Sequence, residues 1–226
     1  MAEYVNYLQL ALPLLWRGLL ITFRVSLVCI LIGLGIGFPS ALARVYGPRW
    51  LKWLVTGYIE ILRGTPVLVQ LFLVYYGLPQ FGVTFSAYQS AFIALGLNSG
   101  AYQAEYFRGA IQAISSGQMM AARSLGMSKL KAIRYVIIPQ AFRYALPAWS
   151  NEVVAMVKIT SIVYLIAVPE VLYVARELMA KYFNPFETYI TVGAIYLIIV
   201  GLLTVLLHYI EKHTAIPGME VVGGRT

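Results

Sequence analysis

Long apolar stretches alternate with short polar segments along almost the whole chain. The apolar stretches cover about residues 14–43, 53–78, 88–107, 146–175 and 186–208. A helix needs roughly 20 predominantly apolar residues to cross a bilayer. The pattern therefore predicts an all-α integral membrane protein with five transmembrane helices in one domain, residues 1–226.

One long polar segment, about residues 114–145, interrupts this pattern between the third and fourth stretches. It contains five basic residues and no acidic residue: Arg123, Lys129, Lys131, Arg134 and Arg143. Loops rich in Lys and Arg stay in the cytoplasm because these residues resist translocation. With five spans, this loop places the N-terminus outside and the C-terminus in the cytoplasm. Most other loop cations then also lie inside, including Arg44, Arg49 and Arg225, whereas Arg176 and Lys181 fall outside.

The segment before the first span has two interpretations. Tyr4, Tyr7 and Leu8 share a helical face with Leu12, which is compatible with a helix lying in the membrane interface. A frayed terminus is equally compatible with residues 1–13.

Composition excludes several classes of protein. The chain is 60% hydrophobic and only 12% charged, with a mean hydropathy of +0.76, so a soluble domain is excluded. The net charge of +8 fits cytoplasmic loops beside anionic lipid better than nucleic acid. Cys29 is the single cysteine, there is no Asp, and no GxxxxGK[ST] loop occurs. An enzyme with its own ATP site is therefore a poor interpretation, and no metal site is expected.

Several ionisable residues lie within the predicted spans, where each needs a partner or a polar cavity. Glu60 and Arg63 are three residues apart, as are Glu105 and Arg108, so each pair can form on one helical face. We interpret both as structural salt bridges. Glu152 in the fourth span either receives a cationic group of a substrate or pairs with a neighbouring helix.

Small and helix-breaking residues mark three further places. Gly33 and Gly37 have the spacing of a helix-packing face. Pro66, after Gly64-Thr65, and the sequence Asn98-Ser99-Gly100 both weaken helical geometry at membrane depth. Breaks at that depth often mark binding sites, although packing kinks are commoner.

The basic segment carries a recognisable motif. Met120-Ala121-Ala122, then Gly126, then Val136-Ile137-Ile138-Pro139 follow the spacing of the cytoplasmic "EAA" loop. The chain thus resembles permease subunits of ATP-binding-cassette (ABC) importers, with Met120 in place of the motif glutamate. The stretches 61–79, 101–118 and 151–161 resemble the polar amino acid uptake branch.

The resemblance implies a five-span type I importer permease in a prokaryotic cytoplasmic membrane. Two permease subunits, expected as a homodimer although a heterodimer is possible, would assemble with two ATPase subunits and an external solute-binding protein. ATP and Mg²⁺ would bind the ATPase subunits, and this chain would hold no cofactor. A short helix around Ser115–Leu125 would dock on the ATPase, Gly126 would end that helix, and Pro139 would start the return into the fourth span. The expected coupling residues are Met120, Ala121, Ala122, Ser124, Gly126, Met127 and Pro139.

The expected substrate is a polar amino acid. If Glu152 faces the pathway, a basic amino acid (arginine, lysine or histidine) is favoured. Glutamine or glutamate is the alternative, and specificity can also reside in the binding protein. An ion-coupled secondary transporter is a weaker alternative because no internal repeat is visible. The candidate substrate-binding residues are Glu152, Asn98, Gln70, Met156, Tyr102 and Thr160.

Overall fold

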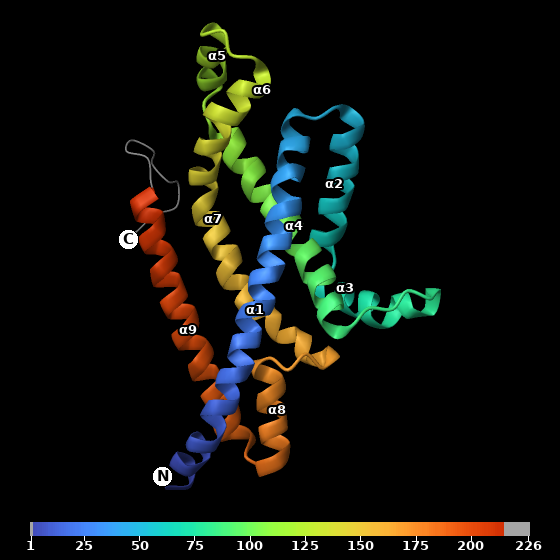
Figure 1. Ribbon diagram of the computed structural model, residues 1–226, viewed down its shortest axis with the longest axis vertical. Coiled ribbons are helices and arrows are strands. Elements are labelled where there is room, and N and C mark those ends of the chain that lie inside the picture. The colour runs from blue at the N-terminus through green and yellow to red at the C-terminus, as the bar shows by residue number, and fades with distance from the viewer. Residues whose placement is uncertain (1, 215–226) are drawn as a thin grey trace.

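The computed structural model describes residues 2–214, and every secondary-structure element within that range is a helix. The long helix α1, Ala2–Tyr46, runs along most of the molecule (Figure 1). The first residues after Met1 thus continue α1 and do not form a separate interfacial helix. Tyr7 is buried, and its hydroxyl bonds the Thr188 hydroxyl at 2.8 Å, so this end is tied to the bundle. Arg225 lies outside the described residues.

The second predicted span is broken. Helix α2, Arg49–Gly64, ends at Thr65, where the chain is extended before Pro66, and α3, Val67–Phe72, starts in another direction. The π-helical turn η1, Leu73–Gly77, and the 3-10 turn η2, Leu78–Phe81, continue α3. The two halves meet at 103°, so α3 to η2 projects sideways from the bundle (Figure 1). The break predicted at Pro66 is confirmed.

Helix α4, Ala87–Ala113, crosses the centre of the bundle without interruption. The break expected at Asn98-Ser99-Gly100 is therefore wrong: all three residues are buried and helical. Glycines of α1 explain how closely α1 and α4 pack against each other. A Cβ on Gly37 would lie 2.7 Å from the Gly100 carbonyl oxygen, and one on Gly33 would lie 2.5 Å from Gln103 Nε2. The packing role predicted for Gly33 and Gly37 is confirmed.

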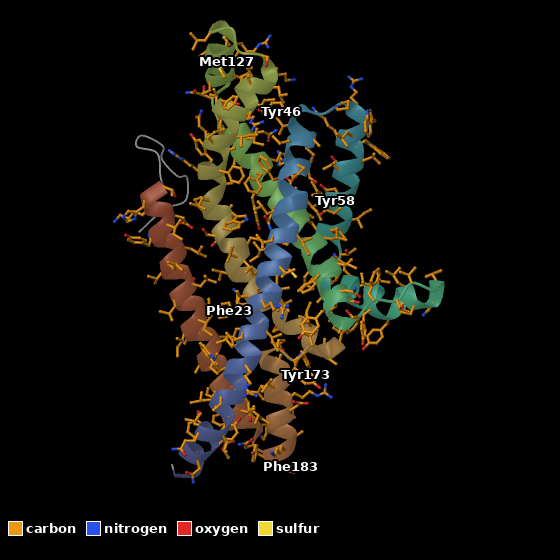
Figure 2. All side chains as sticks on the ribbon, in the orientation of Figure 1. Phe23, Tyr46, Tyr58, Met127, Tyr173 and Phe183 are labelled. Carbon is orange, nitrogen blue, oxygen red and sulfur yellow. The ribbon has the colours of Figure 1, made fainter. Side chains whose placement is uncertain are left out.

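The basic segment folds into helices of its own at one end of the molecule. Helix α5, Ser116–Ser124, is followed by α6, Lys129–Ala132, and by the π-helical turn η3, Ile133–Ile137. These elements run directly into α7, Ile138–Ile159. Met127, between α5 and α6, lies at the opposite end of the molecule from Phe183 (Figure 2).

The last third of the chain differs most from the predicted spans. The 3-10 helix η4, Thr160–Ile166, ends α7, and Ala167 in a left-handed conformation (φ 61°) reverses the chain. Helix α8, Val171–Tyr182, packs on the lower part of α1, and α9, Pro185–Thr214, returns along α1 and α7 (Figure 1). The predicted fourth span, 146–175, is thus wrong at both ends: its helix begins in the basic segment and stops at Ile166.

Three helical stretches of the described chain are long and apolar enough to cross a membrane: Asn6–Tyr46, Lys129–Ile166 and Pro185–Thr214. The bent pair α2–α3 makes a fourth if it is counted as one span. Helix α4 is not among them, because it carries polar side chains that face protein instead of lipid: Ser90, Asn98, Ser99 and Gln103 are all buried. The number of five spans therefore remains a prediction, although α1, α4 and α9 run opposite to α2 and α7 in Figure 1.

Candidate functional site

Helix α5 and the turn after it form an exposed platform. Ser115 caps α5 by accepting the Gly117 N–H at 3.2 Å. After the helix, Gly126 has φ +80°, its N–H bonds the Arg123 carbonyl at 3.0 Å, and the Met127 N–H bonds the Ala122 carbonyl at 3.1 Å. These two bonds define a Schellman ending with glycine in the left-handed position. The helix predicted around Ser115–Leu125 and its end at Gly126 are confirmed.

The platform presents apolar side chains to its surroundings. Met120 is 66% exposed and Leu125 84% exposed, and Leu130 on α6 is 75% exposed. Ala121 and Ser124 are exposed as well, whereas Ala122 is buried and Met127 is partly buried. Exposed apolar side chains on a helix rimmed by cations are typical of a protein-binding surface.

Pro139 does not play the role expected of it. It lies in the first turn of α7, inside a helical run that continues from Lys129, so it does not begin a separate return into the membrane. Its exposed ring borders a small cavity with Tyr135 and Arg143. A proline is tolerated there because the preceding π-helical turn already disturbs the regular ladder of backbone bonds.

A second polar site lies between α4 and α7. Glu152, only 6% exposed, accepts a hydrogen bond from Ser99 Oγ at 2.7 Å and a longer one from the Tyr106 hydroxyl at 3.5 Å. Gln103 continues this network: its Nε2 donates to Ser99 Oγ at 3.0 Å, and its Oε1 accepts from Trp149 Nε1 at 2.9 Å. Among the described residues no basic side chain lies within 4.0 Å of Glu152, so its carboxylate is buried without a cation.

Asn98 and Gln70 form a different cluster, at the α2–α3 break. Asn98 Nδ2 donates to Gln70 Oε1 at 3.1 Å and to the Leu62 carbonyl at 3.0 Å. Gln70 Nε2 donates to the Leu62 carbonyl at 2.8 Å and the Thr65 carbonyl at 3.1 Å. These amides satisfy carbonyls that the broken helix leaves without partners, so in this conformation they stabilise the break.

The three other candidate residues are scattered around these clusters. Met156 is 1% exposed and packs in the apolar core. Thr160 is fully buried, and its hydroxyl lies 2.8 Å from that of Ser26. Tyr102 lies partly exposed beneath the Arg63 guanidinium, 5.1 Å from the ring centre. The structure thus does not bring all six candidate residues into one pocket.

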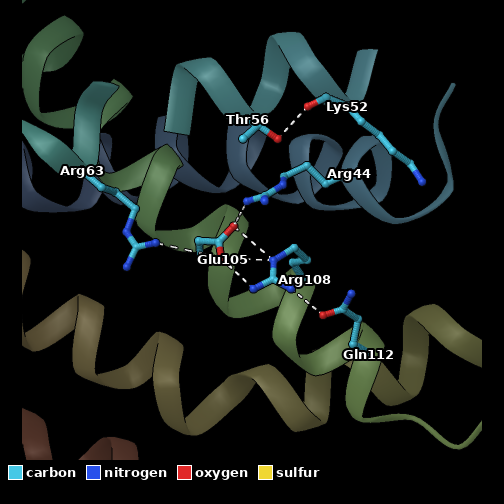
Figure 3. A network of polar contacts seen from close by, with 7 residues as sticks. All are labelled: Arg44, Lys52, Thr56, Arg63, Glu105, Arg108 and Gln112. Atoms are coloured by element: carbon cyan, nitrogen blue, oxygen red, sulfur yellow. Dashed lines mark hydrogen bonds and ion pairs between the residues drawn. The ribbon is translucent and has the colours of Figure 1, made fainter. Parts of the chain in front are cut away.

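An ionic cluster joins α1, α2 and α4 (Figure 3). The Glu105 carboxylate pairs with Arg44 of α1, with Arg108 Nη2 at 2.8 Å, and more loosely with Arg63 Nη1 at 3.9 Å. The predicted Glu105–Arg108 pair is confirmed. The predicted Glu60–Arg63 pair is wrong, because Arg63 turns toward Glu105 and Glu60 is exposed with no ion pair among the described residues.

Three polar residues of the Glu152 network were not predicted: Ser99 and Tyr106, which donate to the carboxylate, and Gln103, which bonds Ser99. They were detectable, because positions 99, 103 and 106 recur at intervals of four and three residues and so share one face of α4. A polar stripe of that spacing in an apolar helix indicates a face turned toward protein or a polar pathway.

Comparison with known proteins settles the family. Residues 30–215 match the model of the binding-protein-dependent transport system inner membrane component. The chain belongs to this family. It is 40% identical over 197 residues to the nopaline transport system permease NocM of Agrobacterium fabrum, covering 83% of this chain and 82% of that protein. It is 36% identical over 202 residues to the arginine transport system permease ArtQ of Bacillus subtilis, covering 89% and 92%.

The fold of a solved structure agrees with this family assignment. A chain of an amino acid ABC transporter crystallised with histidines superposes with a TM-score of 0.87 at 38% identity, covering 93% of this chain and 98% of that one. The protein is therefore an amino acid ABC transporter permease with an all-helical membrane fold. Such permeases lack an ATPase site of their own and work with ATPase and substrate-binding protein partners. An ion-coupled secondary carrier is no longer a competing interpretation.

Proposed function

We propose that this permease forms the translocation pathway for a basic amino acid: arginine, lysine or histidine. The observation that carries the proposal is the Glu152 carboxylate, which is buried between α4 and α7 with no basic side chain of the described residues paired to it. A carboxylate offers about four acceptor positions, and within residues 2–214 only Ser99 and Tyr106 occupy any of them. A guanidinium, ammonium or imidazolium group would supply the missing charge.

The likeness to relatives supports the substrate class only in part. ArtQ is named for arginine, NocM for nopaline, and TcyB of Bacillus subtilis, 37% identical, for L-cystine. Glutamine or glutamate therefore stays the alternative, with specificity carried by the external binding protein. In the basic-substrate proposal, Asn98, Gln70 and Tyr102 contribute only in a conformation that frees their present partners, and Met156 and Thr160 shape the wall behind Glu152.

Uptake measurements test this assignment. The transporter is reconstituted in proteoliposomes with its binding protein, and ATP-dependent uptake of arginine, histidine and glutamine is measured. Glu152→Gln is expected to reduce arginine uptake by about tenfold to a hundredfold, the loss of one charge-assisted contact, while sparing glutamine. Glu60→Gln, which changes an exposed carboxylate, is the matched control. Equal loss for arginine and glutamine would assign Glu152 a structural role.

The platform of α5 and the Gly126 turn is the proposed dock for the ATPase subunit. Met120, Ala121 and Ser124 supply its exposed face, Ala122 and Met127 pack beneath, and Gly126 fixes the turn. Met120 stands where the family motif has glutamate, so the contact at that position is apolar. ATP and Mg²⁺ are assigned to the partner ATPase, and closure of two ATPases would move α5 and, through the continuous helix Lys129–Ile166, the pathway.

The assembly we propose has two permease subunits, most simply two copies of this chain, and two ATPase subunits. Each permease crosses the cytoplasmic membrane five times, with the N-terminus outside and the α5 platform inside. The arrangement of cations supports this orientation, since the α5–α6 segment carries no acidic residue. Cysteine-accessibility labelling of residue 127 from the cytoplasmic side and of residue 183 from the outside tests it.

A further inference from the structure

A groove between α1 and α8 combines an apolar floor with charged walls. Its volume is about 350 Å³. The approach of the helices is tight at its base, where a Cβ on Gly18 would lie 3.0 Å from the Val171 backbone. We call it the α1–α8 groove, and the residues that define it are Leu14, Arg17, Pro169, Glu177, Leu178 and Lys181.

Three charged side chains of the groove are exposed. Arg17 comes from α1, whereas Glu177 and Lys181 lie four residues apart on α8. Within the described part of the chain, none of the three makes an ion pair within 4.0 Å. The groove therefore presents two cations and one carboxylate that can form hydrogen bonds with a bound molecule.

The spacing of Arg17 and Arg44 along α1 matches the thickness of a bilayer with its headgroups. Arg17 precedes Arg44 by 27 residues on one continuous helix, which corresponds to roughly 40 Å at about 1.5 Å per residue. The hydrocarbon core is about 30 Å thick and the bilayer with headgroups about 40–45 Å. With α1 running across the bilayer and Arg44 at one headgroup layer, Arg17 would reach the other, and it lines the same groove as Lys181 and Glu177.

We propose that the α1–α8 groove holds one phospholipid whose headgroup carries a primary ammonium, as phosphatidylethanolamine does. The phosphate would lie between Arg17 and Lys181, and the ammonium would donate to Glu177. An acyl chain would cover the apolar floor formed by Leu14 and Leu178. This lipid would join α1 to α8 and serve as part of the permease, separate from the amino acid pathway.

The pattern of charges in the groove favours phosphatidylethanolamine over two other common phospholipids. Phosphatidylglycerol satisfies the two cations but places no cation at Glu177. Phosphatidylcholine has a quaternary ammonium with no N–H to donate. The groove should therefore retain phosphatidylethanolamine over both, and neutralising Glu177 should remove that preference.

Native mass spectrometry of the full chain, purified in mild detergent and exposed to equal amounts of the three lipids, tests the proposal. The wild-type chain should retain phosphatidylethanolamine about tenfold over phosphatidylglycerol and phosphatidylcholine. Arg17→Gln with Lys181→Gln should abolish this retention, and Glu177→Gln should shift it toward phosphatidylglycerol. Arg176→Gln removes an exposed cation of α8 that does not line the groove, and it should retain lipid as the wild type does.

Two results would overturn the proposal. One is equal retention of the three lipids by the wild-type chain. The other is unchanged lipid retention in the Arg17/Lys181 double variant; if this variant also binds the external binding protein more weakly, the groove is a protein dock. Each variant is judged by bound lipid on intact protein. The charge-conserving variants Arg17→Lys and Glu177→Asp should keep the selectivity, and loss of selectivity in both would also contradict the proposal.

Discussion

Replacing Gly126 by valine isolates the contribution of one backbone conformation to coupling. Gly126 has φ +80°, and a Cβ built there meets no heavy atom within 4 Å. The cost of a side chain is therefore backbone strain alone, about 1–2 kcal/mol for an ordinary residue and more for a β-branched one. That strain would break the Schellman bonds from Gly126 and Met127 that end α5.

A strain of 1–2 kcal/mol changes the population of the native turn by about 5- to 30-fold. We expect Gly126→Val to insert into the membrane normally, to co-purify less with the ATPase subunit, and to lose substrate-stimulated ATP hydrolysis. Gly126→Asn should lie between valine and wild type, because Asn tolerates the left-handed conformation.

The matched control is Gly109→Ala, at an exposed helical glycine of α4 where an added Cβ also meets nothing. It should leave hydrolysis unchanged. Wild-type levels of stimulated hydrolysis in Gly126→Val, with normal co-purification of the ATPase, would refute the placement of the dock at this turn.

Two further predictions concern the stability of the bundle. Gly37→Val should lower the thermal unfolding temperature in detergent, because its side chain would overpack against the Gly100 carbonyl at a cost of about 1–3 kcal/mol. The control Gly35→Ala, whose Cβ has open space, should leave this temperature unchanged. Equal effects of the two substitutions would argue against the α1–α4 contact. Glu105→Gln should also lower the unfolding temperature, because it leaves cations of three helices without their shared carboxylate. The control Glu60→Gln should change this temperature little. A Glu105→Gln variant as stable as the wild type would show that the ionic cluster contributes no net stability.

The sequence predicted best what depends on local geometry. The helix ending at Gly126, the break at Pro66 and the close fit at Gly33 and Gly37 all follow from glycine or proline at a defined place in an apolar pattern. The helix α5 and its ending were therefore predictable almost residue by residue, whereas the continuous helix through Pro139 was not.

What the sequence could not supply is the set of partners across helices. Arg63 has a suitable carboxylate three residues away in Glu60, yet it turns to Glu105 on another helix. Likewise Asn98 was interpreted as a site of helix weakness, whereas its amide satisfies a carbonyl of the broken α2. Such choices depend on which helices become neighbours, and hydropathy does not contain that information.

The contacts between helices also have a consequence for how the chain enters the membrane. Helix α4 is too polar to pass a test of length and hydropathy, because its buried Ser99 and Gln103 are matched to α1 and α7. Its residues Ser99 and Gln103 are synthesised after α1 but before Glu152. On its own in lipid, α4 would expose unsatisfied hydroxyl and amide groups. If α4 is one of the five proposed spans, we therefore expect its insertion to be assisted by α1 and completed only when α7 arrives, so that membrane integration and tertiary folding become one process.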